Sequence, residues 1–154
     1  MDLGDLLSPE AVFPSLRAKN KKQALQEVAQ KAAGLTGLDA RDIFETLLQR
    51  EKLGSTGVGR GIAIPHGRIA ALPRIVSLFA RLEEPIDFEA LDGEPVDLIF
   101  LLLAPEHAGA DHLKALARIS RLLREPSSIE KLKAAKDRPA LYSVLTEPAA
   151  SHAA

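Results

Sequence analysis

His66 lies in an Ile-Pro-His-Gly sequence near the end of a glycine-rich stretch, residues 54–68. Five of these fifteen residues are glycines, which allow positive φ angles and close approach of other groups. Pro65 fixes φ and removes a hydrogen-bond donor directly before the histidine. This composition suits a rigid segment that presents one imidazole. A nucleophile that carries a phosphoryl group is one interpretation of His66, and a hydrogen-bonded histidine in a turn-rich connection is the other.

His112 is the second candidate, because it falls in the first turn of a predicted helix that follows a long apolar strand. Ligands in α/β proteins bind at strand ends, and a helix N-terminus offers free N–H groups to an anion. His112 or the helix end could therefore hold phosphoryl oxygens while His66 attacks phosphorus. Arg50, Arg60 and Arg68 flank His66, and arginine suits phosphate through its bidentate geometry. A surface or hydrogen-bonded role is the simpler alternative for His112.

Other kinds of site fit the sequence poorly. A nucleotide-binding P-loop needs Lys-Ser/Thr after its last glycine, whereas Ile62 follows Gly61, and no Gly-x-Ser-x-Gly hydrolase motif occurs. His107 and His112 are five residues apart, which is not the spacing of two zinc ligands on one helix. We assign no role to His107 or to His152 in the tail. We expect no metal and no cofactor.

The composition is that of an ordinary globular chain of 154 residues, 46% hydrophobic and 27% charged, with a net charge of −1. The charge does not indicate nucleic-acid binding, and the absence of cysteine excludes disulfides and thiolate chemistry. No signal peptide is recognisable, and the longest apolar run is far shorter than the ~20 residues of a membrane span. We expect one cytoplasmic domain over residues 1–154, with 147–154 as a frayed tail.

The elements that must position these histidines follow from hydrophobic spacing and capping residues. Asn20 and Asp39 are predicted to cap two helices; Gly34 and Gly37 should end the first, and the second should end near residues 50–52. Three more helices are predicted near 111–123, from a Ser128 cap to 135, and after an Asp137 cap. Strands are predicted at 11–13 (ended by Pro14), 62–64 (ended by Pro65), 75–82 and 96–103, with a possible short strand at 86–88. This order predicts a single α/β domain, a mixed β-sheet flanked by helices on both faces.

Two long motifs resemble a known family. The run from Arg50 to Arg68, Arg-Glu-Lys-Leu-Gly-Ser-Thr-Gly-Val-Gly-Arg-Gly-Ile-Ala-Ile-Pro-His-Gly-Arg, resembles the active-site signature of the mannitol/fructose-type enzyme IIA domains of the bacterial phosphoenolpyruvate-dependent phosphotransferase system (PTS). The apolar run from 95 to 105, followed by His112-Leu113 at the start of a helix, resembles the second half of the same domain. The resemblance covers about residues 3–146, and the phrase Leu-Gly-Ser-Thr-Gly is most like the nitrogen-type branch.

The resemblance implies roles for three residues. His66 would accept a phosphoryl group from the phosphohistidine of a small HPr-like carrier, His112 would orient or stabilise that group, and Arg50 would stabilise charge. The nitrogen-type branch implies regulation of target proteins such as potassium-transport components or sensor kinases. From the charge and the short apolar runs we expect no nucleic acid and no membrane insertion, and from the absence of an acidic metal-binding motif we expect no magnesium. A sugar-specific protein that passes the group to a separate IIB chain is the alternative.

Two other classes of function are alternatives to a phosphocarrier. One is a non-catalytic binding module that keeps the fold, although both histidines and the glycine stretch are present. The other is a small-molecule hydrolase with His66 as a base, although the sequence offers no paired nucleophile. A carrier protein would also need an apolar depression around the site; candidates are Val58, Ile62, Ile64 and Phe88, with the core as the alternative location for each.

Overall fold

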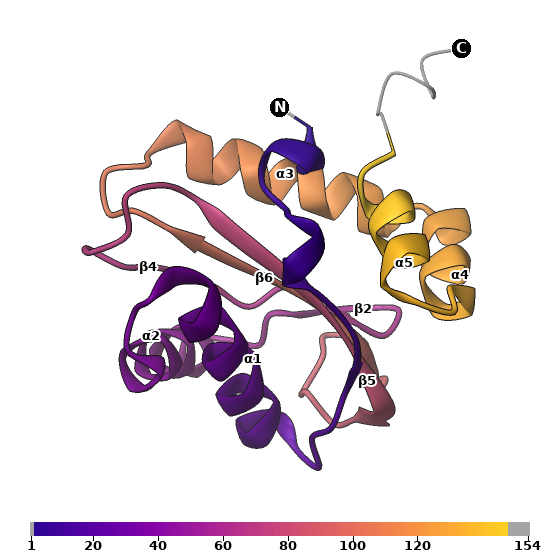
Figure 1. Ribbon diagram of the computed structural model, residues 1–154. Helices are drawn as coiled ribbons and strands as arrows, with labels where there is room; N and C mark the ends of the chain where they lie inside the picture. The colour runs from indigo at the N-terminus through magenta and orange to yellow at the C-terminus, as the bar shows by residue number, and fades with distance from the viewer. Residues whose placement is uncertain (1, 148–154) are drawn as a thin grey trace.

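The computed structural model describes residues 2–147. Within that range a six-stranded sheet is packed between helices, and two short 3-10 helices precede the first strand (Figure 1). In chain order the elements are η1 (Leu3–Asp5), η2 (Pro9–Ala11), β1 (Val12–Leu16), α1 (Lys21–Thr36), α2 (Ala40–Lys52), β2 (Gly57–Gly59), β3 (Ile62–Ala63), β4 (His66–Arg68), β5 (Val76–Ile86), β6 (Val96–Ala104), α3 (Ala110–Arg124), α4 (Pro126–Ala134) and α5 (Arg138–Leu145). The predicted α/β class is confirmed.

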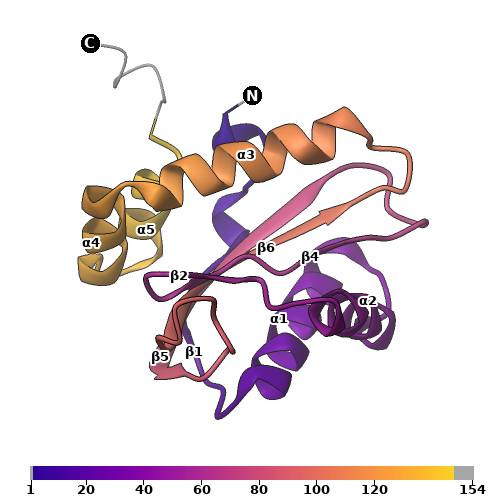
Figure 2. The same cartoon turned by 180° about the vertical axis from the view of Figure 1, so that it is seen from behind.

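The sheet is mixed and is organised around β6. The strand order is β1-β5-β6-β3-β2, and β4 also pairs with β6. β5 is antiparallel to β6, whereas β3 and β4 both run parallel to it. Helices α1 and α2 cover one face and α3 crosses the other, with α4 and α5 beside the C-terminal end of α3 (Figures 1 and 2). The predicted helices on both faces are therefore present.

The central position of β6 explains its composition. From Leu98 to Ala104 no residue is more than 1% exposed, because helices cover both faces of the strand. Phe100 of β6 meets Phe79 of β5 edge to face, with 6.2 Å between the ring centroids. The β6 strand therefore forms a rigid base for the residues attached at its C-terminal end.

The predicted helix caps are confirmed at three positions. The side chains of Asn20, Asp39 and Asp137 each accept a hydrogen bond from a backbone N–H of the following first turn, at 2.8, 2.8 and 3.0 Å. The predicted end of α1 at Gly34 is wrong, because the helix continues through it to Thr36. Gly37, with φ +76°, ends the helix in the left-handed conformation that favours glycine.

Two strands continue past the ends predicted for them, and each contains a proline. Pro14 lies inside β1, an edge strand that pairs only with β5 among the described residues, so its missing N–H leaves no ladder bond unmade. Pro85 lies inside β5 where the register with β6 is irregular, between Arg81 and Ile86. The possible short strand at 86–88 is not separate, since Ile86 is the last residue of β5.

Helix α4 begins earlier than predicted. Ser128 is not its cap but lies inside the helix, and Glu125 takes the N-cap position. Pro126 is the first residue of α4, because a proline at this position has the right φ angle and lacks only an N–H that would be unpaired anyway. The predicted frayed tail, apart from residue 147, lies outside the described residues.

Gly57 in β2 supports a prediction about stability. A Cβ atom at Gly57 would lie 2.9 Å from both Cα and Cβ of Ala90. Gly57→Ala is therefore expected to lower the free energy of unfolding by about 1–3 kcal/mol through overpacking. Gly34→Ala is the matched control, since nothing lies within 4 Å of the added methyl group and the change should stabilise α1. Urea unfolding of both variants measures the difference, and a Gly57→Ala protein as stable as Gly34→Ala would contradict the prediction.

Candidate functional site

The two candidate histidines meet at the C-terminal end of β6. His66 is the first residue of β4 and is paired with Leu102 of β6, while His112 lies in the first turn of α3, which follows β6 after a short loop. Their ring centroids are 5.9 Å apart and the ring planes are at 87°, an edge-to-face arrangement. The structure therefore brings together a strand end, a helix N-terminus and two imidazoles.

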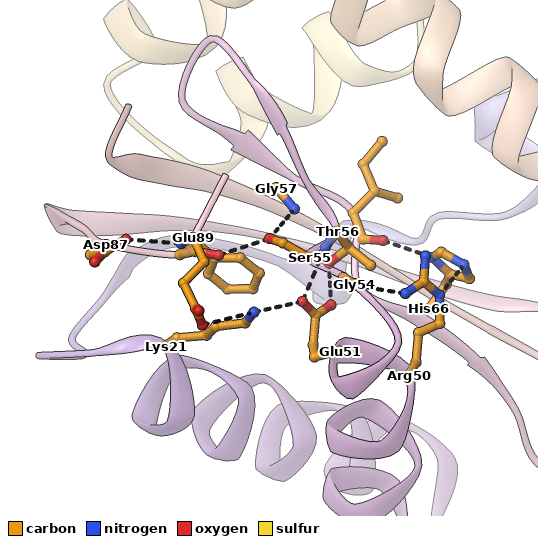
Figure 3. Close-up of polar contacts among 12 residues, drawn as sticks. Lys21, Arg50, Glu51, Gly54, Ser55, Thr56, Gly57, His66, Asp87 and Glu89 are labelled. Carbon is orange, nitrogen blue, oxygen red and sulfur yellow. Dashed lines mark hydrogen bonds and ion pairs between the residues drawn. The ribbon is translucent and has the colours of Figure 1, made fainter. Parts of the chain in front are cut away.

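The hydrogen bonds of His66 define its tautomer. Nδ1 lies 2.9 Å from the carbonyl oxygen of Ile64, and Nε2 lies 3.3 Å from Nε of Arg50 (Figure 3). A carbonyl oxygen only accepts hydrogen bonds, so Nδ1 must carry the proton. Nε2 then holds the lone pair and accepts from the arginine. A neutral imidazole in this tautomer presents Nε2 as its nucleophilic atom.

Arg50 lies in the last turn of α2, and its Nε faces the lone pair on Nε2 of His66. Its Nη1 donates to the carbonyl of Gly54 at 2.8 Å, which orients the guanidinium while Nε faces His66. The other flanking arginines have different partners. Arg60 donates to the carbonyl of Arg124 at 2.7 Å, and Arg68 donates to the carbonyl of Glu106 at 3.1 Å.

His112 is buried and incompletely bonded. It is only 5% exposed, and its Nδ1 has no hydrogen-bond partner among residues 2–147. Burial lowers the pKa of His112 below its usual value, and the positive charges that His66 carries when protonated and that Arg68 carries lower it further. His112 is therefore neutral near pH 7.

The lowered pKa of His112 predicts a pH dependence of stability. The unfolded chain binds a proton at this residue below about pH 6.5 more readily than the native state does. The free energy of unfolding should therefore fall as the pH is lowered through this value, and it should fall less in His112→Gln. Urea unfolding at about pH 7 and about pH 5.5 measures both slopes. Equal slopes in the two proteins would contradict an unfavourable buried charge at residue 112.

The glycine stretch forms a hairpin that leads into His66. β2 and β3 are antiparallel and are joined through Arg60 and Gly61, whose φ angles are +59° and +81°. Positive φ at both central residues is what a type I′ hairpin turn requires, and of the two only Gly61 adopts it without strain. The chain then crosses Pro65 and pairs with β6 again at His66. β2 and β4 were not predicted from the sequence, because three-residue strands have too few positions to show a period.

The apolar surface near the site differs from the predicted one. Of the four candidates only Val58 is exposed, at 51%, and the core interpretation is right for Ile62, Ile64 and Phe88. Two exposed leucines were missed: Leu53, 85% exposed, follows the helix of Arg50, and Leu113, 66% exposed, is adjacent to His112. The sequence could have indicated both leucines, because Leu53 lies three residues after Arg50 and Leu113 directly follows His112.

Among residues 2–147, the remaining histidine is not part of this site. His107 is exposed in the loop between β6 and α3, and His152 lies outside the described residues. Within residues 2–147, no three His, Cys, Asp or Glu side chains are grouped as metal ligands would be. No helix in that range has the length and apolar character to cross a membrane.

The fold and this arrangement can be compared with known proteins. Residues 5–147 match the family model described as phosphoenolpyruvate-dependent sugar phosphotransferase system, EIIA 2. The chain belongs to this family. It is 62% identical over 153 residues to a nitrogen regulatory protein from Bradyrhizobium diazoefficiens, covering 99% of this chain and all of the relative. It is 41% identical to the nitrogen regulatory protein of Pseudomonas aeruginosa, covering 94% of this chain and 95% of the relative.

A solved structure supports the same assignment. The nitrogen regulatory protein IIA-Ntr from Neisseria meningitidis superposes with a TM-score of 0.89 at 37% identity, covering 94% of this chain and 99% of that one. The EIIA resemblance seen in the sequence is therefore confirmed, and so is its nitrogen-type branch. EIIA domains of the PTS are phosphocarriers, so the family establishes phosphotransfer as the class of chemistry to which this site must be fitted.

Proposed function

We propose that Nε2 of His66 accepts a phosphoryl group from the phosphohistidine of an HPr-like carrier of the nitrogen type (NPr). The observation that carries this proposal is the hydrogen bond from Nδ1 of His66 to the carbonyl of Ile64. It holds the proton on Nδ1 and leaves the Nε2 lone pair beside Arg50. A neutral, oriented imidazole is what attack on phosphorus requires.

The proposed transfer is a direct exchange of the phosphoryl group between two histidine nitrogens and uses no metal or cofactor. The Nε2 lone pair of His66 forms the new P–N bond while the P–N bond of the donor histidine breaks and that nitrogen recovers its electron pair. The phosphorylated ring keeps its Nδ1 proton and continues to donate to Ile64. The loose transition state of phosphoryl transfer asks mainly for in-line positioning and stabilisation of charge on the phosphoryl oxygens.

Two neighbours of His66 can supply that stabilisation. Arg50 faces Nε2 at 3.3 Å, so its guanidinium can turn from the lone pair to the oxygens of the incoming group. The ring of His112 stands edge-to-face against His66, with 5.9 Å between the ring centroids. We assign His112 the binding of a phosphoryl oxygen, and Arg50 the neutralisation of its charge.

The proposed output is regulation of target proteins in the cytoplasm by the phosphorylation state of His66. Potassium-transport components and sensor kinases are the proposed targets. The regulatory output is supported by relatives named nitrogen regulatory proteins that match this chain along nearly its whole length. Delivery of the phosphoryl group to a separate IIB chain is the alternative for the same site.

An intact-mass assay tests the proposal. The protein is incubated with phosphoenolpyruvate, enzyme I and an NPr-like carrier, with and without a IIB chain. One acid-labile phosphoryl group, located on Nε2 by ¹⁵N and ³¹P NMR, is the expected result, and its rapid loss to IIB would favour the sugar-specific alternative. A chain that gains no group from any of several carriers would instead be a binding module.

A further inference from the structure

Glu51 is a buried carboxylate directly after Arg50 in the last turn of α2. The residue is 7% exposed, and each of its two carboxylate oxygens accepts hydrogen bonds. Oε1 accepts from the backbone N–H of Thr56 at 3.0 Å and lies 3.0 Å from Nζ of Lys21. Oε2 accepts from the hydroxyl of Thr56 (Figure 3). Burying a charge is unfavourable unless it is paired and hydrogen-bonded, and Glu51 satisfies both conditions.

The Thr56 end of this network leads to His66. The carbonyl of Thr56 accepts from the backbone N–H of Ile64 at 2.9 Å. The carbonyl of Ile64 accepts from Nδ1 of His66 at 2.9 Å, the hydrogen bond that defines the tautomer. Glu51 is thus connected to the ring of His66 through two residues, Thr56 and Ile64. Each of them is hydrogen-bonded to its neighbour on either side in this network. Figure 3 shows Glu51, Thr56 and His66 in this sequence above the end of α2.

The network is also held at its other end. Lys21, the first residue of α1, bridges Glu51 and Glu89, which lies 3.5 Å away, and its Nζ is 4.9 Å from the centre of the Phe88 ring. Ser55 donates to the carbonyl of Phe88 at 2.8 Å. The loop between α2 and β2 is therefore fixed from α1, from α2 and from the segment after β5, which limits the positions that Thr56 can take.

We propose that Glu51 is a positioning residue for His66. By holding Thr56, it sets the position of the Ile64 carbonyl and so keeps the His66 proton on Nδ1 and the lone pair on Nε2. The same turn of α2 then supplies both the arginine that faces the phosphoryl group and the carboxylate that orients the nucleophile. The consequence for transfer rests on the proposed phosphocarrier function, whereas the effect on the imidazole does not.

Glu51→Gln tests the proposal because the amide keeps the shape and loses the charge. ¹⁵N NMR of the imidazole distinguishes the two neutral tautomers. We expect His66 of the wild type to show a protonated Nδ1, and we expect Glu51→Gln to shift toward the tautomer with the proton on Nε2. Since protonated Nε2 is not a nucleophile, transfer from the carrier should slow about tenfold to hundredfold. A His66 spectrum identical to that of the wild type in folded Glu51→Gln would overturn the proposal.

The two readouts separate this inference from the function on which it draws. If the His66 spectrum responds to Glu51→Gln but no carrier phosphorylates the wild type, the positioning role stands and the phosphocarrier proposal fails. If the wild type is phosphorylated on His66 but the spectrum does not respond, the phosphocarrier proposal stands and the positioning role fails.

A control and a second variant complete the test. Arg138→Met removes a charged hydrogen bond of similar kind, from Nε to the carbonyl of Val12 at 2.8 Å, in α5. It should lower the free energy of unfolding without changing the His66 spectrum. If Glu51→Gln does not fold, Thr56→Val removes only the hydroxyl donor and should shift the same spectrum by a smaller amount. An unchanged spectrum in that variant would then overturn the proposal.

Discussion

His66→Ala is expected to abolish phosphorylation by the carrier. In the proposed mechanism only Nε2 of His66 combines a free lone pair with a facing arginine, and alanine removes the accepting atom itself. The intact-mass assay should therefore show no added group at any time at which the wild type is fully modified. The half-buried position of His66 in a three-residue strand means that the fold should survive the change.

His107→Ala is the matched control for this experiment. His107 is exposed and lies in the loop between β6 and α3, so its loss should leave the phosphorylation rate at the wild-type value. Transfer to His66→Ala at a rate near that of the wild type would place the phosphoryl group on another residue. His112 would then be the first position to examine, because its ring lies 5.9 Å from that of His66.

Arg50→Lys is expected to slow transfer strongly while keeping the positive charge. Arg50 uses Nη1 to bind the Gly54 carbonyl and Nε to face His66, and an ammonium group cannot reproduce both contacts in this fork geometry. Loss of one preorganised donor to developing charge lowers rates by about a hundredfold to a thousandfold. Single-turnover transfer from the phosphorylated carrier, sampled by rapid quench and mass spectrometry, measures this change.

Arg41→Lys on the same helix is the control, since this arginine is exposed in the first turn of α2. It should transfer as the wild type does. An Arg50→Lys protein with an unchanged rate would show that charge alone is sufficient at this position, and Arg50→Met would then be expected to carry the loss. A normal rate in both variants would remove Arg50 from the proposed mechanism.

Much of the fold could be predicted because its signals are local. The apolar run of β6, the caps at Asn20, Asp39 and Asp137, and the helical spacing that follows them each depend on neighbouring residues. Two of the errors occurred at prolines, Pro14 and Pro85. Whether a strand continues through a proline depends on whether a neighbouring strand needs the missing N–H, and that neighbour is distant in the sequence.

The candidate site, too, was predictable from the sequence only in part. Residue type, spacing and family resemblance were enough to select His66, His112 and Arg50 as candidates. They could not show the buried Glu51, because a glutamate near the end of an amphipathic helix is ordinarily in solvent. Its burial follows from the packing of α1 and of the loop around it.

The sequence by itself determined the fold class, the family and the identity of the chemical groups at the site. Only the tertiary structure decided the state of those groups: which nitrogen of His66 carries the proton, that His112 is buried with a lowered pKa, and that Arg50 reaches the lone pair. The physical reason is that tautomer, pKa and orientation depend on partners at hydrogen-bond distance. Those partners include a carbonyl two residues before His66, an arginine on α2 and a histidine on α3, which come together only when β4 and α3 meet at the end of β6.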